Sequence, residues 1–502
     1  MRKNAFWLAI FSIIFIGNVA NAQSLPFQCG TQDLYELKSN MLQIREDMRG
    51  FVKSRNAITY VPVRFFLVAK SDGSNRPAET LILQALCNMN ENYADQDIQF
   101  YLKEFKYYNN TAVYNNPGGF SGYNAIDGQM IYNAINIFVV NDAGDGAAAY
   151  YQGPSTGPDR ADWIVVGKAY VDDVRVLSHE VGHFFSLPHP FSGWESSGGW
   201  DPLVHGIQVG FTAPDGQTPN EFVDGTNCTT AGDAICDTPA DYMFPSGDCT
   251  YTGNAKDPHG ELVSPLKENI MNYHFGCSSY TFTPDQKTNI SNSLFHSSRN
   301  YVRPSFTPNL AQITGPPAII SPNPGETVDT YNWVVLEWED LPAADHYLVE
   351  IANSTIGNLR FLVDENQLVL NNLEPNKGYI WKVLAYNDYS TCSGFSSPKI
   401  FKTGDIFSGT FEVPGIDNWW IQPNPVQGTD PVLVNIETPQ SLEIDLTLRT
   451  MSGQVISTIK NYPLPGGISV IEIPAYGLPA GMYLVTLQSK GGIETKHVAI
   501  VD

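Results

Sequence analysis

The sequence predicts a multidomain protein in which an α/β domain is followed by two all-β sandwich domains. Between residues 58 and 187, strand-like apolar runs alternate with two stretches of helical periodicity. Beyond residue 315, short β-rich runs recur at even spacing, with turn residues between them and no helical pattern. A proline-rich stretch, residues 304–324, separates the two patterns and is typical of a linker.

The first 22 residues are expected to be a secretory signal peptide. Arg2 and Lys3 precede an apolar run, residues 5–16, and Ala20-Asn21-Ala22 supplies small residues for cleavage before Gln23. The apolar run is shorter than the roughly 20 residues that a spanning helix needs. No later stretch is both long enough and free of charge, so we expect a secreted protein without a transmembrane segment.

The net charge and the cysteine content indicate which partners and which disulfides to expect. The formal net charge of −23 excludes nucleic acid as an expected partner, because neutralising phosphates requires a basic surface. Seven cysteines enter an oxidising space, and four of them lie close together in sequence and predict two disulfides: Cys228, Cys236, Cys249 and Cys277. Four cysteines allow three pairings, and the odd total leaves at least one thiol unpaired.

The elements of the α/β domain follow from periodicity. We expect strands at residues 60–69, 98–101, 135–141 and 163–167, and helices at 79–93 and 172–187. Pro188 ends the second helix. Glycine, proline, aspartate and threonine dominate residues 191–269, so little regular structure is expected there, and the clustered cysteines should act as staples rather than metal ligands.

Three histidines and a glutamate lie within eleven residues, at His179, Glu180, His183 and His189. Residues four apart share a helix face, so His179 and His183 can bind one ion. Glu180 is rotated about 100° from His179, where it can act on a water that the metal activates without being a ligand. Three neutral ligands leave the fourth position of zinc open, which predicts a catalytic zinc site.

This motif resembles the zinc signature of the metzincins and, among them, that of the pappalysin family. Residues 231–239 resemble the family's Asp-Thr-Pro segment, and Asn269-Ile270-Met271-Asn272-Tyr273 resembles its Met-turn. The resemblance covers about residues 58–303 and implies a zinc-dependent endopeptidase. It also implies that Met271 forms an apolar floor under the zinc and that Tyr273 reaches towards the substrate oxyanion. Ser186 departs from the glycine usual in the family at the bend before His189.

The same resemblance implies the disulfide pairs Cys228–Cys249 and Cys236–Cys277. It also implies latency through a propeptide cysteine, for which Cys29 is the candidate: its thiolate would occupy the open position on zinc until the propeptide is removed. A disulfide from Cys29 to Cys87 or Cys392 is the alternative.

Structural calcium is a further expectation from the family. Three aspartates lie in the glycine-rich region where calcium commonly replaces regular structure: Asp224, Asp233 and Asp237. The sequence does not assign individual ligands, and solvated turn carboxylates are the alternative for each.

The β-rich part carries two further resemblances. Trp338, Tyr347 and the turn at residues 373–379 resemble a fibronectin type III domain. Pro423-Asn424-Pro425, residues 478–483 and the closing residues 496–501 resemble the C-terminal sorting domain of the type IX secretion system. That resemblance implies the type IX machinery as a partner and export to the outside or surface of a Gram-negative bacterium. An adhesive β-sandwich is the alternative.

The complete expectation is a secreted zinc endopeptidase acting on proteins or peptides and made as a latent proenzyme. Its expected parts are a signal peptide (1–22), a propeptide (23–57), a peptidase domain (58–303), a linker (304–314), a fibronectin-like domain (315–403), a linker (404–420) and a sorting domain (421–502). Two alternatives stay open: a surface adhesin with an inactive peptidase fold, and a zinc hydrolase acting on something other than peptides.

Overall fold

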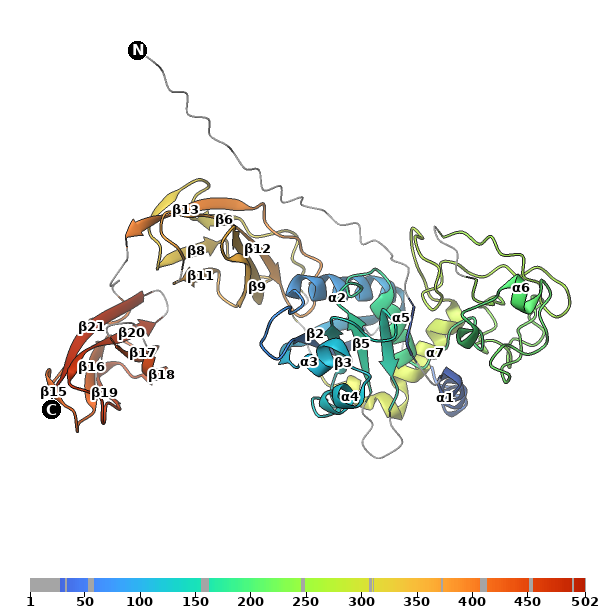
Figure 1. Cartoon of the computed structure of the whole chain (residues 1–502), viewed down its shortest axis with the longest axis horizontal. Helices are drawn as coiled ribbons and strands as arrows, with labels where there is room; N and C mark the ends of the chain where they lie inside the picture. Colours follow the sequence, from blue (N-terminus) through green and yellow to red (C-terminus); the bar gives the residue numbers. More distant parts are fainter. Residues whose placement is uncertain are drawn as a thin grey trace, which may run out of the picture. The chain divides into compact units, whose positions relative to one another are not determined.

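The computed structural model describes residues 28–31, 34–52, 58–154, 162–244, 249–306, 309, 311–371, 373–406, 413–450, 455–489 and 492–501. The expected signal peptide lies outside these residues. The chain divides into two compact units, the first comprising residues 1–312 and 386–392, the second residues 313–385 and 393–502. The architecture is mixed, with helices and a sheet in the first unit and further sheets in the second (Figure 1).

The first unit is built around a five-stranded sheet with the order β2-β1-β3-β5-β4. Its strands are β1 (Thr59–Ala69), β2 (Ile98–Asn109), β3 (Ile135–Val140), β4 (Ala149–Gln152) and β5 (Trp163–Gly167). Strands β2, β1, β3 and β5 pair in parallel, whereas β4 pairs antiparallel to β5 at one edge. The central strands β3 and β5 are buried along their whole length, as expected for parallel strands that are covered on both faces.

Seven α-helices accompany this sheet among the described residues: α1 (Leu34–Asp47), α2 (Glu79–Tyr93), α3 (Thr111–Asn115), α4 (Phe120–Asp127), α5 (Val176–Phe184), α6 (Pro202–His205) and α7 (Pro284–Phe295). Helix α5 contacts α2, β4 and β5, so it lies against the edge of the sheet (Figure 1). It is shorter than the expected helix at 172–187, because residues 168–175 form turns and the chain leaves the helix at Phe185.

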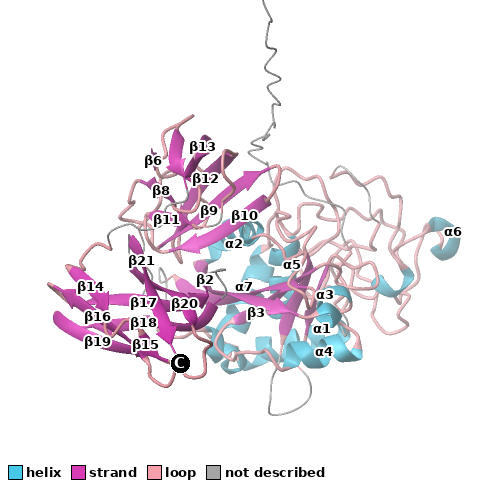
Figure 2. Cartoon of the chain, turned by 60° about the vertical axis from the view of Figure 1, so that its left-hand side comes forward, coloured by secondary structure: helices cyan, strands magenta, loops and turns pink. Residues whose placement is uncertain are grey.

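The segment between α5 and α7 is almost entirely loop, as its composition predicts (Figure 2). The disulfide pairing implied by the family resemblance is wrong. The structure joins Cys228 to Cys236 and Cys249 to Cys277, with Cα–Cα distances of 5.0 Å and 4.7 Å.

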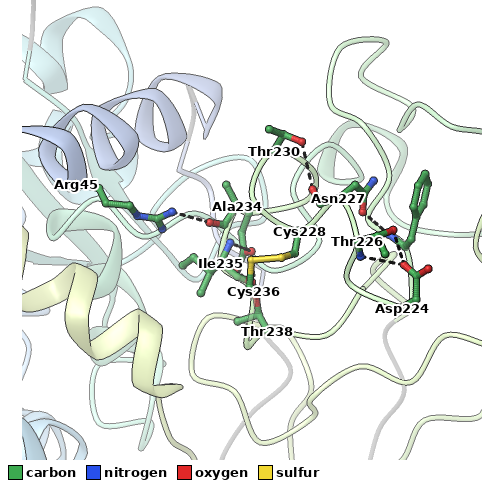
Figure 3. The surroundings of a disulfide bond; sticks show 12 residues. Arg45, Asp224, Thr226, Asn227, Cys228, Thr230, Ala234, Ile235, Cys236 and Thr238 are labelled. Atoms are coloured by element: carbon green, nitrogen blue, oxygen red, sulfur yellow. Dashed lines mark hydrogen bonds between the residues drawn. A yellow bond between two sulfur atoms is a disulfide. The ribbon is translucent and has the colours of Figure 1, made fainter. Parts of the chain in front are cut away.

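The local course of the chain explains the observed pairing. A tight turn, in which the Ala231 amide donates to the Asn227 carbonyl, brings Cys236 back to Cys228. Figure 3 shows the resulting disulfide and the Thr230 hydroxyl that donates to the same carbonyl. The Cys249 amide donates to the Phe275 carbonyl at 2.8 Å and places Cys249 beside Cys277. Cysteines bridge only when their Cα atoms lie within about 7 Å, so these backbone contacts select the partners.

A third disulfide joins Cys87 of α2 to Cys392, within the first unit. Neither cysteine therefore pairs with Cys29, which is free and buried.

The described part of the second unit consists of strands and loops (Figure 2). Its first group of strands is β6 (Ile319–Ser321), β7 (Thr327–Thr330), β8 (Val334–Trp338), β9 (His346–Asn353), β10 (Gly357–Val363), β11 (Gln367–Leu370), β12 (Gly378–Tyr386) and β13 (Lys399–Ile406). They form two sheets, β10-β9-β12-β13-β7 and β11-β8-β6. Trp338 of one sheet and Trp381 of the other lie in the same hydrophobic core, which is consistent with a β-sandwich.

The remaining strands form a second such group. They are β14 (Asn418–Ile421), β15 (Val426–Gln427), β16 (Val432–Thr438), β17 (Leu442–Thr450), β18 (Val455–Leu464), β19 (Gly467–Ile473), β20 (Gly481–Ser489) and β21 (Gly492–Val501). Their sheets are β14-β16-β19 and β15-β21-β20-β17-β18, and both contribute to one core. This group begins before residue 421, since Val413 and Trp419 belong to its core. None of the described helices is long and apolar enough to cross a membrane.

Candidate metal centre

Helix α5 places His179, Glu180 and His183 in the interior of the first unit. All three side chains are buried, and the helix buries every one of its residues. His179 and His183 lie one turn apart, and their Nε2 atoms are 3.1 Å from each other. The four-residue spacing therefore brings the two imidazole rings together on one face of the helix, as helical periodicity predicts.

The end of α5 turns the chain towards the third histidine. The Leu187 amide donates to the Gly182 carbonyl at 2.9 Å, and the Ser186 amide donates to the His183 carbonyl at 2.8 Å. These two bonds form a Schellman motif, which requires a left-handed residue after the helix. Ser186 occupies that position with φ 69°, so the bend is made without the usual glycine.

His189 completes the cluster. Its Nε2 lies 3.1 Å from Nε2 of His179 and 3.1 Å from Nε2 of His183, so the three atoms form an equilateral triangle. Three nitrogen ligands of a tetrahedral zinc ion are about 3.3 Å apart, given zinc–nitrogen distances of about 2.0–2.1 Å. The donor set and its spacing therefore fit one zinc ion.

The outer nitrogens of the three rings are held by hydrogen-bond acceptors. His179 Nδ1 lies 2.9 Å from the Ile270 carbonyl, and His183 Nδ1 lies 2.7 Å from the Leu187 carbonyl. A carbonyl only accepts, so Nδ1 carries the proton and the lone pair of Nε2 faces the centre. Burial lowers the pKa of all three rings, that of His189 to about 3, which keeps them neutral and ready to bind a metal.

Sequence reasoning did not find the partner of the third ring. His189 Nδ1 lies 3.0 Å from Oε1 of Glu195, six residues further along the chain. Burial raises the pKa of Glu195 to about 7. A carboxylate just after the third histidine was the available sequence signal.

Met271 and Tyr273 both lie at the centre. Met271 is fully buried beneath α5, where a Cβ on Gly182 would come within 2.4 Å of its Sδ. The Tyr273 hydroxyl lies 3.5 Å from Nε2 of His189, and its ring packs on Phe191. Burial raises the pKa of Tyr273 well above its usual range, so the hydroxyl keeps its proton.

Cys29 approaches the cluster from outside the helix. Its Sγ is 3.5 Å from Nε2 of His183 and 3.6 Å from Oε2 of Glu180. Cys29 and the three histidines form a group whose ligand atoms all lie within 4.8 Å of one another. Burial, and then the charge of Glu180, raise the pKa of the thiol. A divalent cation at the centre would favour the thiolate instead.

Glu180 is a further titratable group at the centre. Burial raises its pKa to about 8, and its Oε2 accepts a hydrogen bond from the Thr31 hydroxyl at 3.1 Å. A nearby metal ion would again favour the charged form of this carboxyl group.

The three aspartates considered for calcium do not meet at one point. Asp233 accepts hydrogen bonds from Thr238, whereas Asp224 is exposed and bonds within its own turn. Asp237 accepts bonds from the Thr283 hydroxyl and the Asp285 amide at the start of α7. Among the described residues, no compact group of three metal-ligating side chains includes any of them.

Similarity to known proteins also supports a metallopeptidase. The chain is 27% identical over 253 residues to an extracellular metalloprotease of Colletotrichum graminicola, covering 45% of this chain and 73% of that protein. It is 26% identical over 292 residues to an extracellular metalloprotease of Sordaria macrospora, covering 52% of this chain and 86% of that protein. These relatives support a metallopeptidase. No family model matches the chain.

Among solved structures, a promirolysin mutant of Tannerella forsythia matches with 17% identity and a TM-score of 0.37, over 55% of this chain and 97% of that one. A TM-score this low does not establish a shared fold. The two sequence relatives are fungal, so the expectation of a bacterial export route rests on the C-terminal motifs alone.

Proposed function

We propose that the chain is a secreted zinc endopeptidase that is made as a latent proenzyme. The observation that carries the proposal is the triangle of three Nε2 atoms, 3.1 Å apart. Glu180 follows His179 on α5, and its Oε2 lies 3.6 Å from the Cys29 Sγ that contacts His183. Similarity to curated extracellular metalloproteases gives independent support.

His179, His183 and His189 would hold the zinc ion. When bound, zinc activates a water molecule and polarises the carbonyl of the scissile peptide bond. Glu180 would act as the general base, accepting a proton at its carboxylate and returning it to the leaving amine. We assign to the protonated Tyr273 hydroxyl the role of donating a hydrogen bond to the oxyanion that develops on the substrate; its distance of 3.5 Å from Nε2 of His189 supports this role.

The segment that contains Cys29 supports latency. It pairs with the free side of edge strand β4: the Gly30 amide donates to the Ala149 carbonyl, and the Tyr151 amide donates to the Thr31 hydroxyl, both at 2.8 Å. Thr31 in turn donates to Glu180, so one short segment contacts both the ligand cluster and the general base. A substrate needs the same space, and this segment must leave first.

Helix α1 anchors this segment to the loop region. The Lys38 ammonium is buried and donates to the carbonyls of Thr230 and Gly232 at 3.0 Å and 2.8 Å. Arg45 donates to the Ala234 carbonyl at 3.1 Å (Figure 3). These contacts hold residues that we assign to the propeptide against the proposed peptidase domain.

The test is casein cleavage by the full chain before and after limited trypsin treatment, with Glu180→Ala as the matched control. We expect activity only after trimming, and its loss in Glu180→Ala and in the presence of a chelator. Cys29→Ser removes the thiol but keeps the pairing with β4, so it should still need trimming and be activated faster than wild type. If trimmed wild type is as silent as Glu180→Ala while it holds one zinc per chain, the peptidase proposal is wrong and an inactive adhesin becomes the better reading.

We propose further that residues 315–403 form a fibronectin type III-like domain and that the last group of strands, residues 413–502, forms a type IX sorting domain. Two sheets sharing one core in each group, together with the quoted motifs, support these assignments. Fusing the last group of strands to a fluorescent protein in a type IX-competent bacterium tests the second: we expect export, and retention in the periplasm would refute it.

A further inference from the structure

The three candidate zinc ligands are not supported in the same way. Backbone carbonyls hold the outer nitrogens of His179 and His183. The outer nitrogen of His189 instead contacts a carboxylate, with Nδ1 3.0 Å from Oε1 of Glu195. Glu195 therefore gives His189 an acidic partner at Nδ1.

Glu195 is itself held in place. Its second oxygen, Oε2, accepts a hydrogen bond from the Gly193 amide at 2.8 Å, and the residue begins a short 3₁₀ helix, Glu195–Ser197. A Cβ on Gly193 would come within 2.7 Å of the Ala213 Cβ and 2.8 Å of the Thr218 Cβ, at φ +95°. Glycine therefore allows the chain to turn back so that Glu195 meets His189.

The ring of His189 needs such support because it leaves the helix. His179 and His183 are carried by α5, whereas His189 lies five residues beyond the helix end at Phe184. Phe191 stacks on one face of the imidazole, with ring centroids 4.7 Å apart and an interplanar angle of 16°. Stacking fixes the plane of the ring, and the hydrogen bond to Glu195 fixes its rotation within that plane.

A carboxylate beside Nδ1 of a metal-binding histidine has effects that a backbone carbonyl lacks. It fixes the proton on Nδ1, makes Nε2 a stronger donor to a metal, and offsets part of the metal's positive charge in a buried site. We propose that Glu195 is the positioning residue of the metal centre: through His189 it orients the third ligand and raises the affinity for zinc. This inference rests on the proposed zinc site.

The test compares zinc affinity in full-length Glu195→Gln, Glu195→Ala and wild type, by competition with a chromophoric chelator. The same series is made with Cys29→Ser, so that the thiol does not mask the effect. Glutamine keeps an acceptor for Nδ1–H and removes the charge, whereas alanine removes both. We expect affinity to fall about 10–100-fold, in the order wild type, Gln, Ala, as for other partners of metal-bound histidines.

Glu221→Gln is the matched control, because Glu221 is a buried glutamate of the same loop region whose charged neighbours are Asp233, Lys38 and Asp241. It should leave zinc affinity unchanged. The absorption spectrum of the Co²⁺-loaded chain gives a second readout: a reoriented His189 changes the d–d bands in Glu195→Gln and not in Glu221→Gln.

If Glu195 only stabilises the fold, the same measurements should give a different result. In that case Glu195→Gln would lower the melting temperature of the metal-free chain and leave zinc affinity and the Co²⁺ spectrum as in wild type, which overturns the inference. If wild type itself binds no stoichiometric zinc, the metal centre is wrong and the inference falls with it. If wild type binds zinc and both Glu195 variants bind it equally well, only the role of Glu195 is refuted.

Discussion

Replacing Gly182 by alanine tests how closely α5 packs on Met271. A Cβ at this position would lie 2.4 Å from Sδ of Met271 and 3.6 Å from Cε1 of Phe282. Favourable contacts between heavy atoms lie near 3.5–4.0 Å, so Met271 must move by more than about 1 Å. Met271 is fully buried, and it follows Ile270, whose carbonyl holds His179.

The magnitude follows from two opposing effects. Overpacking a buried site destabilises by about 1–3 kcal/mol. Alanine within a helix stabilises by about 0.5–1 kcal/mol relative to glycine. We therefore expect Gly182→Ala to lower the free energy of unfolding by up to about 2.5 kcal/mol. In a Met271→Ala background the clash is gone, and the same change should raise the free energy of unfolding by about 0.5–1 kcal/mol.

The assay is urea denaturation of the metal-free full chain for the four members of this double-mutant cycle. Gly128→Ala is the control, since a Cβ there meets nothing closer than 3.7 Å; it should be neutral or slightly stabilising. A coupling energy of about 1–3 kcal/mol between Gly182 and Met271 is expected. If Gly182→Ala has the same effect with and without Met271, the close packing of α5 on Met271 is refuted.

Three further predictions concern other parts of the first unit. Ser186→Gly should raise the free energy of unfolding by about 0.5–1 kcal/mol in urea denaturation, because glycine relieves the left-handed φ of 69° but costs chain entropy; a decrease would contradict the strain. Lys38→Met should speed alkylation of Cys29 by a thiol reagent, because it breaks the anchor of α1, whereas Arg49→Met, which breaks an exposed pair, should not. In the metal-free chain, Glu221 should contribute a loss of stability as pH rises from about 4.5 to about 9, since burial raises its pKa to about 9 and only the folded state then keeps the proton. Glu221→Gln should flatten this slope in denaturation curves, and an unchanged slope would contradict the assignment.

The sequence predicted those elements whose signal is local. The expected strand at 60–69 and helix at 79–93 correspond to β1 (Thr59–Ala69) and α2 (Glu79–Tyr93). The expected strand at 98–101 was too short, because β2 continues to Asn109 with partly exposed residues that break the apolar run. Helix α7 was missed, although Thr283, Pro284 and Gln286 form a recognisable capping box at its start.

The disulfides were beyond the reach of sequence reasoning for a physical reason. Pairing depends on where a loop returns in space, and that is set by backbone bonds such as the one from Cys249 to Phe275. The expected Cys236–Cys277 bond would have tied the Asp-Thr-Pro segment to the chain after the Met-turn. Asp237 makes a similar connection without sulfur, by accepting hydrogen bonds from Thr283 and Asp285.

The candidate metal centre shows which part of a site a motif can reveal. The histidines are visible because their side chains bind the metal, but their orientation depends on three acceptors that lie 4, 6 and 91 residues away along the chain. The Leu187 and Ile270 acceptors are backbone carbonyls, which any residue supplies, so no sequence pattern marks them and no side-chain substitution removes them. Glu195 is the one acceptor of the three that evolution or an experimenter can change by a single substitution. The affinity of the centre is therefore tunable at Glu195, whereas its geometry at His179 and His183 follows from the fold.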